Sequence, residues 1–122
     1  MIIGKIDNNL EARIELQILT TDETHGIEFL VDTGFNGFLA LPMSLVSRFG
    51  LRLGEVQRGI TADGRTGYFD TVQVQIIWHH KLLLLHAQVL DEPLIGTRLL
   101  QGHELNAKWQ PEGKFTLEIL NQ

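Results

Sequence analysis

The fold of this chain is decided by residues 27–37, which read IEFLVDTGFNG. The first five residues form a short, nearly continuous apolar run, which predicts a buried strand. The run stops at Asp32, and burying a carboxylate is costly unless a partner stabilises it. A threonine hydroxyl, here Thr33, can bond to nearby backbone, and a glycine, here Gly34, permits a tight turn. Asp32 therefore either caps the N–H groups of Gly34 or Phe35, or has a chemical role.

The segments around this stretch predict short strands and two brief helices. Apolar and polar residues alternate over residues 10–18, which is typical of a strand with one buried and one solvent-exposed face. Pro42 can open a short helix over residues 43–49, which Gly50 closes. A second helical stretch is expected over residues 97–105. The other expected strands are residues 2–6, 56–60, 67–77, 82–90 and a closing hairpin of 109–111 with 114–120, while 20–26 are expected to form a loop.

Composition narrows the classes of protein to consider. The chain has 122 residues, of which 43% are hydrophobic and 20% charged, so residues 1–122 are expected to form a single, mostly β domain. Ten basic against fifteen acidic residues give a net charge of −5, which argues against a nucleic-acid partner. There is no cysteine, so disulfides, thiolate zinc sites and cysteine nucleophiles are excluded. No signal peptide or membrane span is recognisable, and we expect a cytoplasmic protein without a membrane partner.

Two later segments carry further signals: a hairpin turn and an echo of the first segment. The tripeptide Ala62-Asp63-Gly64 is a strong signal for a hairpin turn between two strands. Further along, Leu94-Ile95-Gly96 is an apolar pair followed by glycine and a helical stretch. Each half of the chain thus runs strand, loop, apolar strand, glycine, short helix.

With these three segments in this order, the chain resembles the retropepsin-like aspartic peptidases, especially their small single-domain cellular members. The resemblance rests on the LVDTG block at residues 30–34, on LIGTRLL at residues 94–100, and on a glycine-containing hairpin, residues 59–67, where the family has its flap. It covers about residues 10 to 120. It implies a closed, barrel-like acid-protease domain that cleaves peptide bonds without a cofactor.

The resemblance also assigns roles to residues. Asp32 would be catalytic, Thr33 and Gly34 would shape its loop, and the hairpin tip at Ala62, Asp63 and Gly64 would cover an extended peptide substrate. The loop of the second half would be formed by Leu94, Ile95 and Gly96.

Aspartic peptidases need two facing carboxylates that share one proton. None of the other aspartates considered follows an apolar strand end with a hydroxyl residue and glycine after it; these are Asp63, Asp70 and Asp91. The second carboxylate must then come from Asp32 of a second copy across a twofold axis, so the activity requires a homodimer. Because dimers of the family often pair their chain ends, residues 2–6 and 115–120 are candidates for an intersubunit sheet.

Three residues depart from the family pattern. Phe35 follows the motif glycine, where many members have a small or hydroxyl residue. Asn36 and Thr97 stand where retroviral members carry an ion-paired aspartate and arginine, so substrate-backbone recognition on that side should differ. The acidic pair Asp91-Glu92 precedes a segment that lines the substrate pocket in related enzymes, which predicts a preference for basic side chains nearby.

Other interpretations of the chain stay open. A catalytically silent dimeric module on the same fold would bind an extended peptide without cleaving it, and a monomeric β-domain would lack the dyad altogether. The five histidines are expected to hold no metal, because the adjacent His79 and His80 point to opposite faces of a strand. The other three lie in separate elements: His25, His86 and His103.

Overall fold

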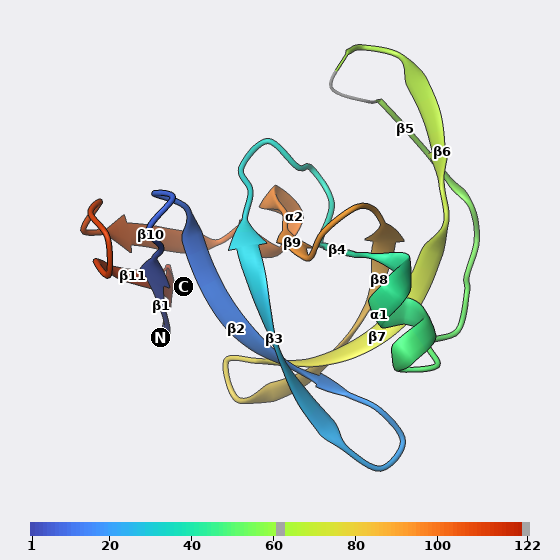
Figure 1. The fold of residues 1–122 in the computed structure, drawn as a ribbon, viewed down its shortest axis with the longest axis horizontal. Helices are drawn as coiled ribbons and strands as arrows, with labels where there is room; N and C mark the ends of the chain where they lie inside the picture. The colour runs from blue at the N-terminus through green and yellow to red at the C-terminus, as the bar shows by residue number, and fades with distance from the viewer. Residues whose placement is uncertain (61–62, 121–122) are drawn as a thin grey trace.

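A computed structural model describes residues 1–60 and 63–120 and contains a mostly β domain with a closed six-stranded barrel and two short helices. Figure 1 shows its arrangement. The strands are β1 (Ile2–Ile6), β2 (Ala12–Leu19), β3 (Thr24–Val31), β4 (Leu39–Leu41), β5 (Gln57–Ile60), β6 (Thr66–Phe69), β7 (Thr71–Trp78), β8 (Lys81–Val89), β9 (Leu94–Ile95), β10 (His103–Ala107) and β11 (Lys114–Ile119). The helices are α1 (Met43–Arg48) and α2 (Thr97–Leu100).

The barrel is closed by pairing of the first and last of its six strands. Its strands follow the order β2-β3-β9-β4-β8-β7, and β7 returns to β2 through the pairs Ile18↔Ile76 and Leu19↔Gln75. Beyond β2 the same sheet continues through β1 and β11 to β10, which lie together at the left of Figure 1. None of the helices in the described part of the chain is long and apolar enough to cross a membrane.

The alternation predicted for residues 10–18 is confirmed from Ala12 onward in β2, whereas Leu10 lies before the strand, exposed and with a φ of 62°. The apolar side chains of β2 turn inward and are buried, while Glu15 between them is exposed. They meet the inward side chains of β7 and the centrally placed Phe29 of β3, which has no exposed surface. Burying a side chain of this size contributes about 1.5–3 kcal/mol relative to leaving it exposed, so this inner surface accounts for much of the barrel's stability.

Several predicted elements are confirmed with shifted boundaries. The helix expected over residues 43–49 is α1, and Gly50 after it has a φ of 61°, the left-handed conformation that ends many helices. Strand β3 begins at Thr24, inside the segment expected to be a loop, because it pairs with β2 as far as Leu19↔Thr24. The strand expected over residues 67–77 is divided at Asp70 into β6 and β7.

The predictions for the C-terminal part were wrong in two places. Helix α2 spans only Thr97–Leu100 and does not reach residue 105, because Gly102 takes a φ of 79° and turns the chain into β10. The closing hairpin then joins β10 to β11, with His103↔Ile119 and Ala107↔Phe115 in register, so residues 109–111 belong to its connecting loop rather than to a strand.

The two end strands pair within one chain. Strand β1 lies antiparallel to β11 from Ile2↔Leu117 to Lys5↔Lys114, and it also pairs with β2. Strand β11 has β10 on its other side. Strand β11 is thus paired on both sides, whereas β1 pairs with β2 only at Lys5 and Ile6. The intersubunit sheet expected for residues 2–6 and 115–120 stays a prediction.

Candidate functional site

The site is built where β3 ends beside β9. The two strands run parallel, with Leu30 opposite Leu94 and Val31 opposite Ile95. The Leu30 N–H donates to the Pro93 carbonyl at 3.0 Å, and the Asp32 N–H donates to the Ile95 carbonyl at 2.9 Å. The apolar runs that the sequence singled out in each half are therefore direct neighbours in the sheet, and Asp32 is the first residue beyond it.

The Asp32 carboxylate is oriented by its own turn. Its Oδ1 accepts the Gly34 N–H at 2.9 Å, and the Phe35 N–H donates to the Asp32 carbonyl at 3.1 Å. The side chain is half-buried, and its Oδ2 makes no hydrogen bond or ion pair with another described residue. One oxygen is thus fixed by main chain while the second is available to a ligand or to another carboxyl group. The capping role considered for Asp32 is present, and it is compatible with a chemical role.

The loop after Asp32 is held by hydrogen bonds to the start of α2. The Thr97 N–H donates to the Phe35 carbonyl at 2.8 Å, and the Gly96 N–H donates to the Phe38 carbonyl at 3.0 Å. A Cβ atom on Gly96 would lie 2.1 Å from the Gly37 carbonyl oxygen. Only glycine lets the two segments approach this closely, so Gly96 fixes the position of the Asp32 loop.

The other predicted residues of this loop have less restrictive surroundings. Thr33 is exposed, and Asn36 is exposed as well. A Cβ on Gly34 would meet only the Asp32 Oδ1, at 3.2 Å, and Gly34 does not have a positive φ. Gly34 therefore serves the turn mainly by presenting its N–H to the carboxylate.

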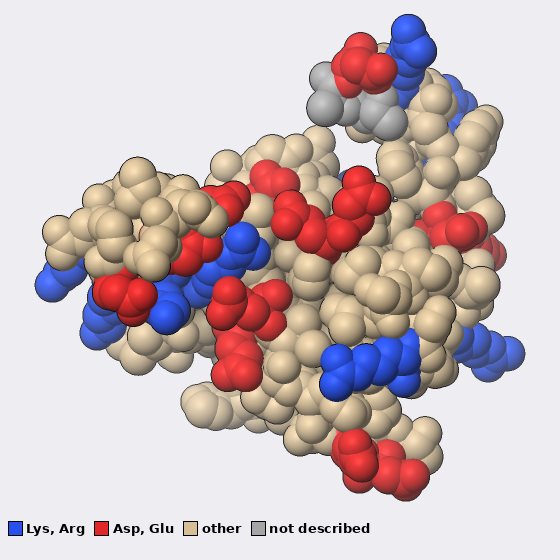
Figure 2. All heavy atoms as spheres, viewed as in Figure 1, with Lys and Arg blue, Asp and Glu red and all other residues tan. Residues whose placement is uncertain are grey.

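The hairpin predicted as a flap is a separate two-stranded sheet, β5–β6, that stands clear of the barrel in Figure 1. Its side chains are largely exposed, with Ile60 at 80% and Tyr68 at 73%. Gly59 and Gly67 lie directly opposite each other and are half-buried, and a Cβ atom on Gly59 would lie 2.9 Å from the Phe69 ring. Figure 2 shows acidic side chains on the barrel surface below the hairpin.

At the tip of the hairpin, the Arg65 N–H donates to the Asp63 Oδ1 at 3.1 Å, and Gly64 has a φ of 83°. These two features form the predicted turn at Asp63 and Gly64, while Ala62 lies outside the described residues.

A pair of histidines, which the sequence placed in unrelated elements, meets at the other end of the barrel. The Nε2 atoms of His79 and His103 are 2.8 Å apart. The His103 Nδ1 faces the carbonyl oxygens of Leu100 and Gln101 at 3.2 and 3.0 Å, and because carbonyls only accept, this nitrogen carries a proton. When His103 carries only this proton, its Nε2 accepts the Nε2–H of His79. Burial, followed by the charges of His103, the N-terminus and His80, lowers the pKa of His79 below its usual value.

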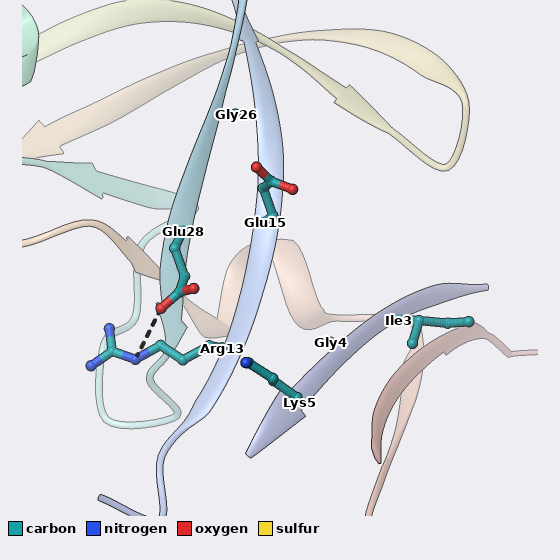
Figure 3. Close-up of a pocket in the computed structure, with 7 residues that line it drawn as sticks. All are labelled: Ile3, Gly4, Lys5, Arg13, Glu15, Gly26 and Glu28. Carbon is teal, nitrogen blue, oxygen red and sulfur yellow. Dashed lines mark ion pairs between the residues drawn. The ribbon is translucent and has the colours of Figure 1, made fainter. Parts of the chain in front are cut away.

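A surface hollow of about 480 Å³ lies on the outer side of β1, β2 and β3, and Figure 3 shows it in close-up. Its lining residues are Ile3, Gly4, Lys5, Arg13, Glu15, Gly26 and Glu28. The Arg13 guanidinium is shared among Asp7, Glu11 and, at 4.0 Å, Glu28. The described residues contain no group of three or more histidine, aspartate or glutamate side chains placed to hold a metal ion.

Comparisons of the chain with protein-family models, with curated proteins and with solved structures give no significant match.

Proposed function

We propose that this chain is a retropepsin-like aspartic endopeptidase that acts as a homodimer, in which the two copies of Asp32 activate a water molecule. The observation that carries the proposal is the junction of β3 and β9. The strand that ends at Asp32 and the strand that ends at Gly96 pair there in parallel. The close approach of Gly96 fixes the position of the loop that follows Asp32.

The chemistry follows from two carboxyl groups brought close together. Two like charges at short distance cannot both ionise, so the pair shares one proton and titrates as a unit. The ionised carboxylate takes a proton from water as the water oxygen attacks the peptide carbonyl carbon, while the protonated carboxyl donates a hydrogen bond to the carbonyl oxygen. The orientation of Asp32 supports this role, since Oδ1 is held by the Gly34 N–H and Oδ2 is available.

The proposal needs two chains, because no carboxylate among the described residues is hydrogen-bonded to Asp32. The Asp91 side chain is exposed in the turn before β9, and Asp70 is exposed between β6 and β7. A twofold axis places a residue opposite its own copy, which is the arrangement a shared proton requires.

The hairpin β5–β6 is proposed as the flap that covers the substrate. Among the described residues its two strands pair only with each other, so an extended peptide can bond to the main chain of the hairpin as an added strand. The acidic surface below it in Figure 2 supports the preference for basic side chains that the Asp91-Glu92 pair predicts.

The proposal is tested by incubating the purified chain with a peptide library from acidic to neutral pH, beside the variant Asp32→Asn. The matched control is Asp22→Asn, which makes the same change at an exposed aspartate in the β2–β3 turn. We expect cleavage by the wild type and the control and none by Asp32→Asn. Peptide binding without cleavage by a folded dimer would favour the silent binding module instead.

A further inference from the structure

Two histidines from distant parts of the chain face each other beside Trp78. His79 lies in the two-residue turn between β7 and β8, and His103 is the first residue of β10. Their Nε2 atoms are 2.8 Å apart, and their rings are inclined by only 18° with centroids 5.0 Å apart. The sequence expectation that the histidines hold no metal concerned His79 and its neighbour His80, but the structure pairs His79 with His103 instead.

We propose that His79 and His103 bind one square-planar divalent ion such as Cu(II) through their Nε2 atoms. With metal–nitrogen bonds of about 2.0–2.1 Å, two nitrogens at a right angle on an ion are about 2.9 Å apart, whereas a tetrahedral angle requires about 3.4 Å. The observed 2.8 Å fits neighbouring corners of a square. Cu(II) takes this geometry and binds nitrogen ligands more tightly than the other first-row divalent ions. The remaining corners are open to water or to a further ligand.

His103 is held in the orientation that a metal ligand needs. Its Nδ1 faces the carbonyl oxygens of Leu100 and Gln101 at 3.2 and 3.0 Å. Since a carbonyl only accepts, the proton of the neutral ring stays on Nδ1 and leaves a lone pair on Nε2. Metal-binding histidines commonly donate their second ring nitrogen to a carbonyl or a carboxylate in this way. The carbonyls therefore fix both the tautomer and the direction of the ligand nitrogen.

His79 supplies the second nitrogen after its proton moves from Nε2 to Nδ1. Its Nδ1 makes no hydrogen bond with another described residue, so it can take this proton, and the ring can turn toward an ion beside the line that joins the two Nε2 atoms. Neither histidine forms an ion pair with a carboxylate of the described residues. Burial lowers the pKa of His79, which favours the neutral ring that a metal ligand requires.

The turn that carries His79 has an unfavourable backbone conformation for its residues. His79 has a φ of 50° and His80 a φ of 65°, whereas asparagine and glycine are the usual residues at both positions of such a hairpin turn. Side chains with a Cβ atom are strained in this region, and residues held there cluster at ligand sites. The strain, together with the facing nitrogens, points to a binding role for the imidazole of His79.

The test is a Cu(II) titration at neutral pH in the presence of glycine, a weak chelator that competes with binding to single exposed histidines. Trp78 lies 5.3 and 5.5 Å from the two rings, so bound Cu(II) should quench its fluorescence. All variants carry Trp109→Phe, which leaves Trp78 as the one tryptophan of the chain.

The variant His103→Gln removes one ligand nitrogen, and the matched control His86→Gln makes the same change at an exposed histidine of β8. We expect one Cu(II) per chain in the parent and in the control. Binding by His103→Gln should be weaker by roughly a hundredfold, since the loss of a mere outer-shell partner already costs about 10–100-fold in metal affinity. A second control, His80→Asn, should keep the affinity, because asparagine suits a positive φ and His80 is not a ligand.

Pulsed EPR of the Cu(II) complex counts the bound imidazoles through their remote ring nitrogens, and it needs no peptidase activity. Two imidazoles support the site. One or none, or equal affinity of the parent and His103→Gln, means an adventitious ion only and overturns it. Tighter binding of Zn(II) than of Cu(II) overturns the square-planar assignment. If circular dichroism shows that His103→Gln does not fold, the imidazole count of the parent decides. Absence of peptide cleavage would overturn the proposed function and leave this site standing.

Discussion

The close approach of Gly96 to the Asp32 loop predicts a large effect of Gly96→Ala on stability. The added methyl group would lie 2.1 Å from the Gly37 carbonyl oxygen and 2.8 Å from the Phe35 carbonyl oxygen. Both are main-chain atoms, so the clash cannot be relieved by turning a side chain. The backbone of Gly96 has a φ of −101°, which alanine adopts freely, and the effect is therefore steric rather than conformational.

The expected loss of stability follows from the hydrogen bonds that the added methyl group would break. Three hydrogen bonds hold the loop to this segment, donated by the N–H groups of Gly96, Thr97 and Arg98. At about 1 kcal/mol each, their loss lowers the free energy of unfolding by about 3 kcal/mol. Urea unfolding followed by circular dichroism measures this as a midpoint lowered by roughly 2 M.

Gly34→Ala is the matched control, because its methyl group would meet only the Asp32 Oδ1, at 3.2 Å. We expect it to lower the free energy of unfolding by less than about 1 kcal/mol. If the two variants unfold at the same urea concentration, the close approach of the two segments does not stabilise the site, and the reasoning is refuted.

Three further predictions concern the core and the titrating groups. Phe29→Ala, at a fully buried position, should lower the free energy of unfolding by about 3–5 kcal/mol in urea titrations; a loss below about 1 kcal/mol would contradict the core assignment. The pKa of His79 is lowered on folding, so as pH falls His79 takes up a proton in the unfolded chain before it does so in the folded chain. The free energy of unfolding should therefore be undiminished above pH 6.5 and decline as pH falls below that value. His79→Gln should make the free energy of unfolding less dependent on pH in this range. An unchanged slope of that free energy against pH would argue against a role of His79. The Glu11 N–H and the Arg13 guanidinium lower the pKa of Asp7, so its contribution to stability should be present above pH 3.8 and lost as pH falls further; acid titration of Asp7→Asn should lack this loss.

The local elements were predictable because their signals are local. Alternation along residues 12–18 corresponds to β2, and Pro42 and Gly50 bounded α1 to within a residue. The hairpin signal at Asp63 and Gly64 corresponds to the turn between β5 and β6. Each of these depends on side-chain periodicity or on backbone conformations that only a few residue types favour, so neighbours in the sequence suffice to specify them.

The C-terminal part was not predictable from the same signals. Residues 103–105 were expected to continue the second helix, but they lie in β10 because β11 offers a strand to pair with and Gly102 allows the turn. Pairing between strands outweighs weak local preference, since it satisfies a row of backbone groups at once. The meeting of His79 with His103, 24 residues apart, likewise leaves no trace in the sequence.

By itself, the sequence determined that the chain is mostly β, that Asp32 ends a buried strand, and that a second apolar-apolar-Gly segment occurs later. Only the tertiary structure decided that these two segments are parallel neighbours, that Gly96 contacts the Asp32 loop, and that β1 and β11 pair with each other. The reason is physical: periodicity specifies which face of a strand is buried, whereas the partner of each strand depends on the closure of the whole barrel.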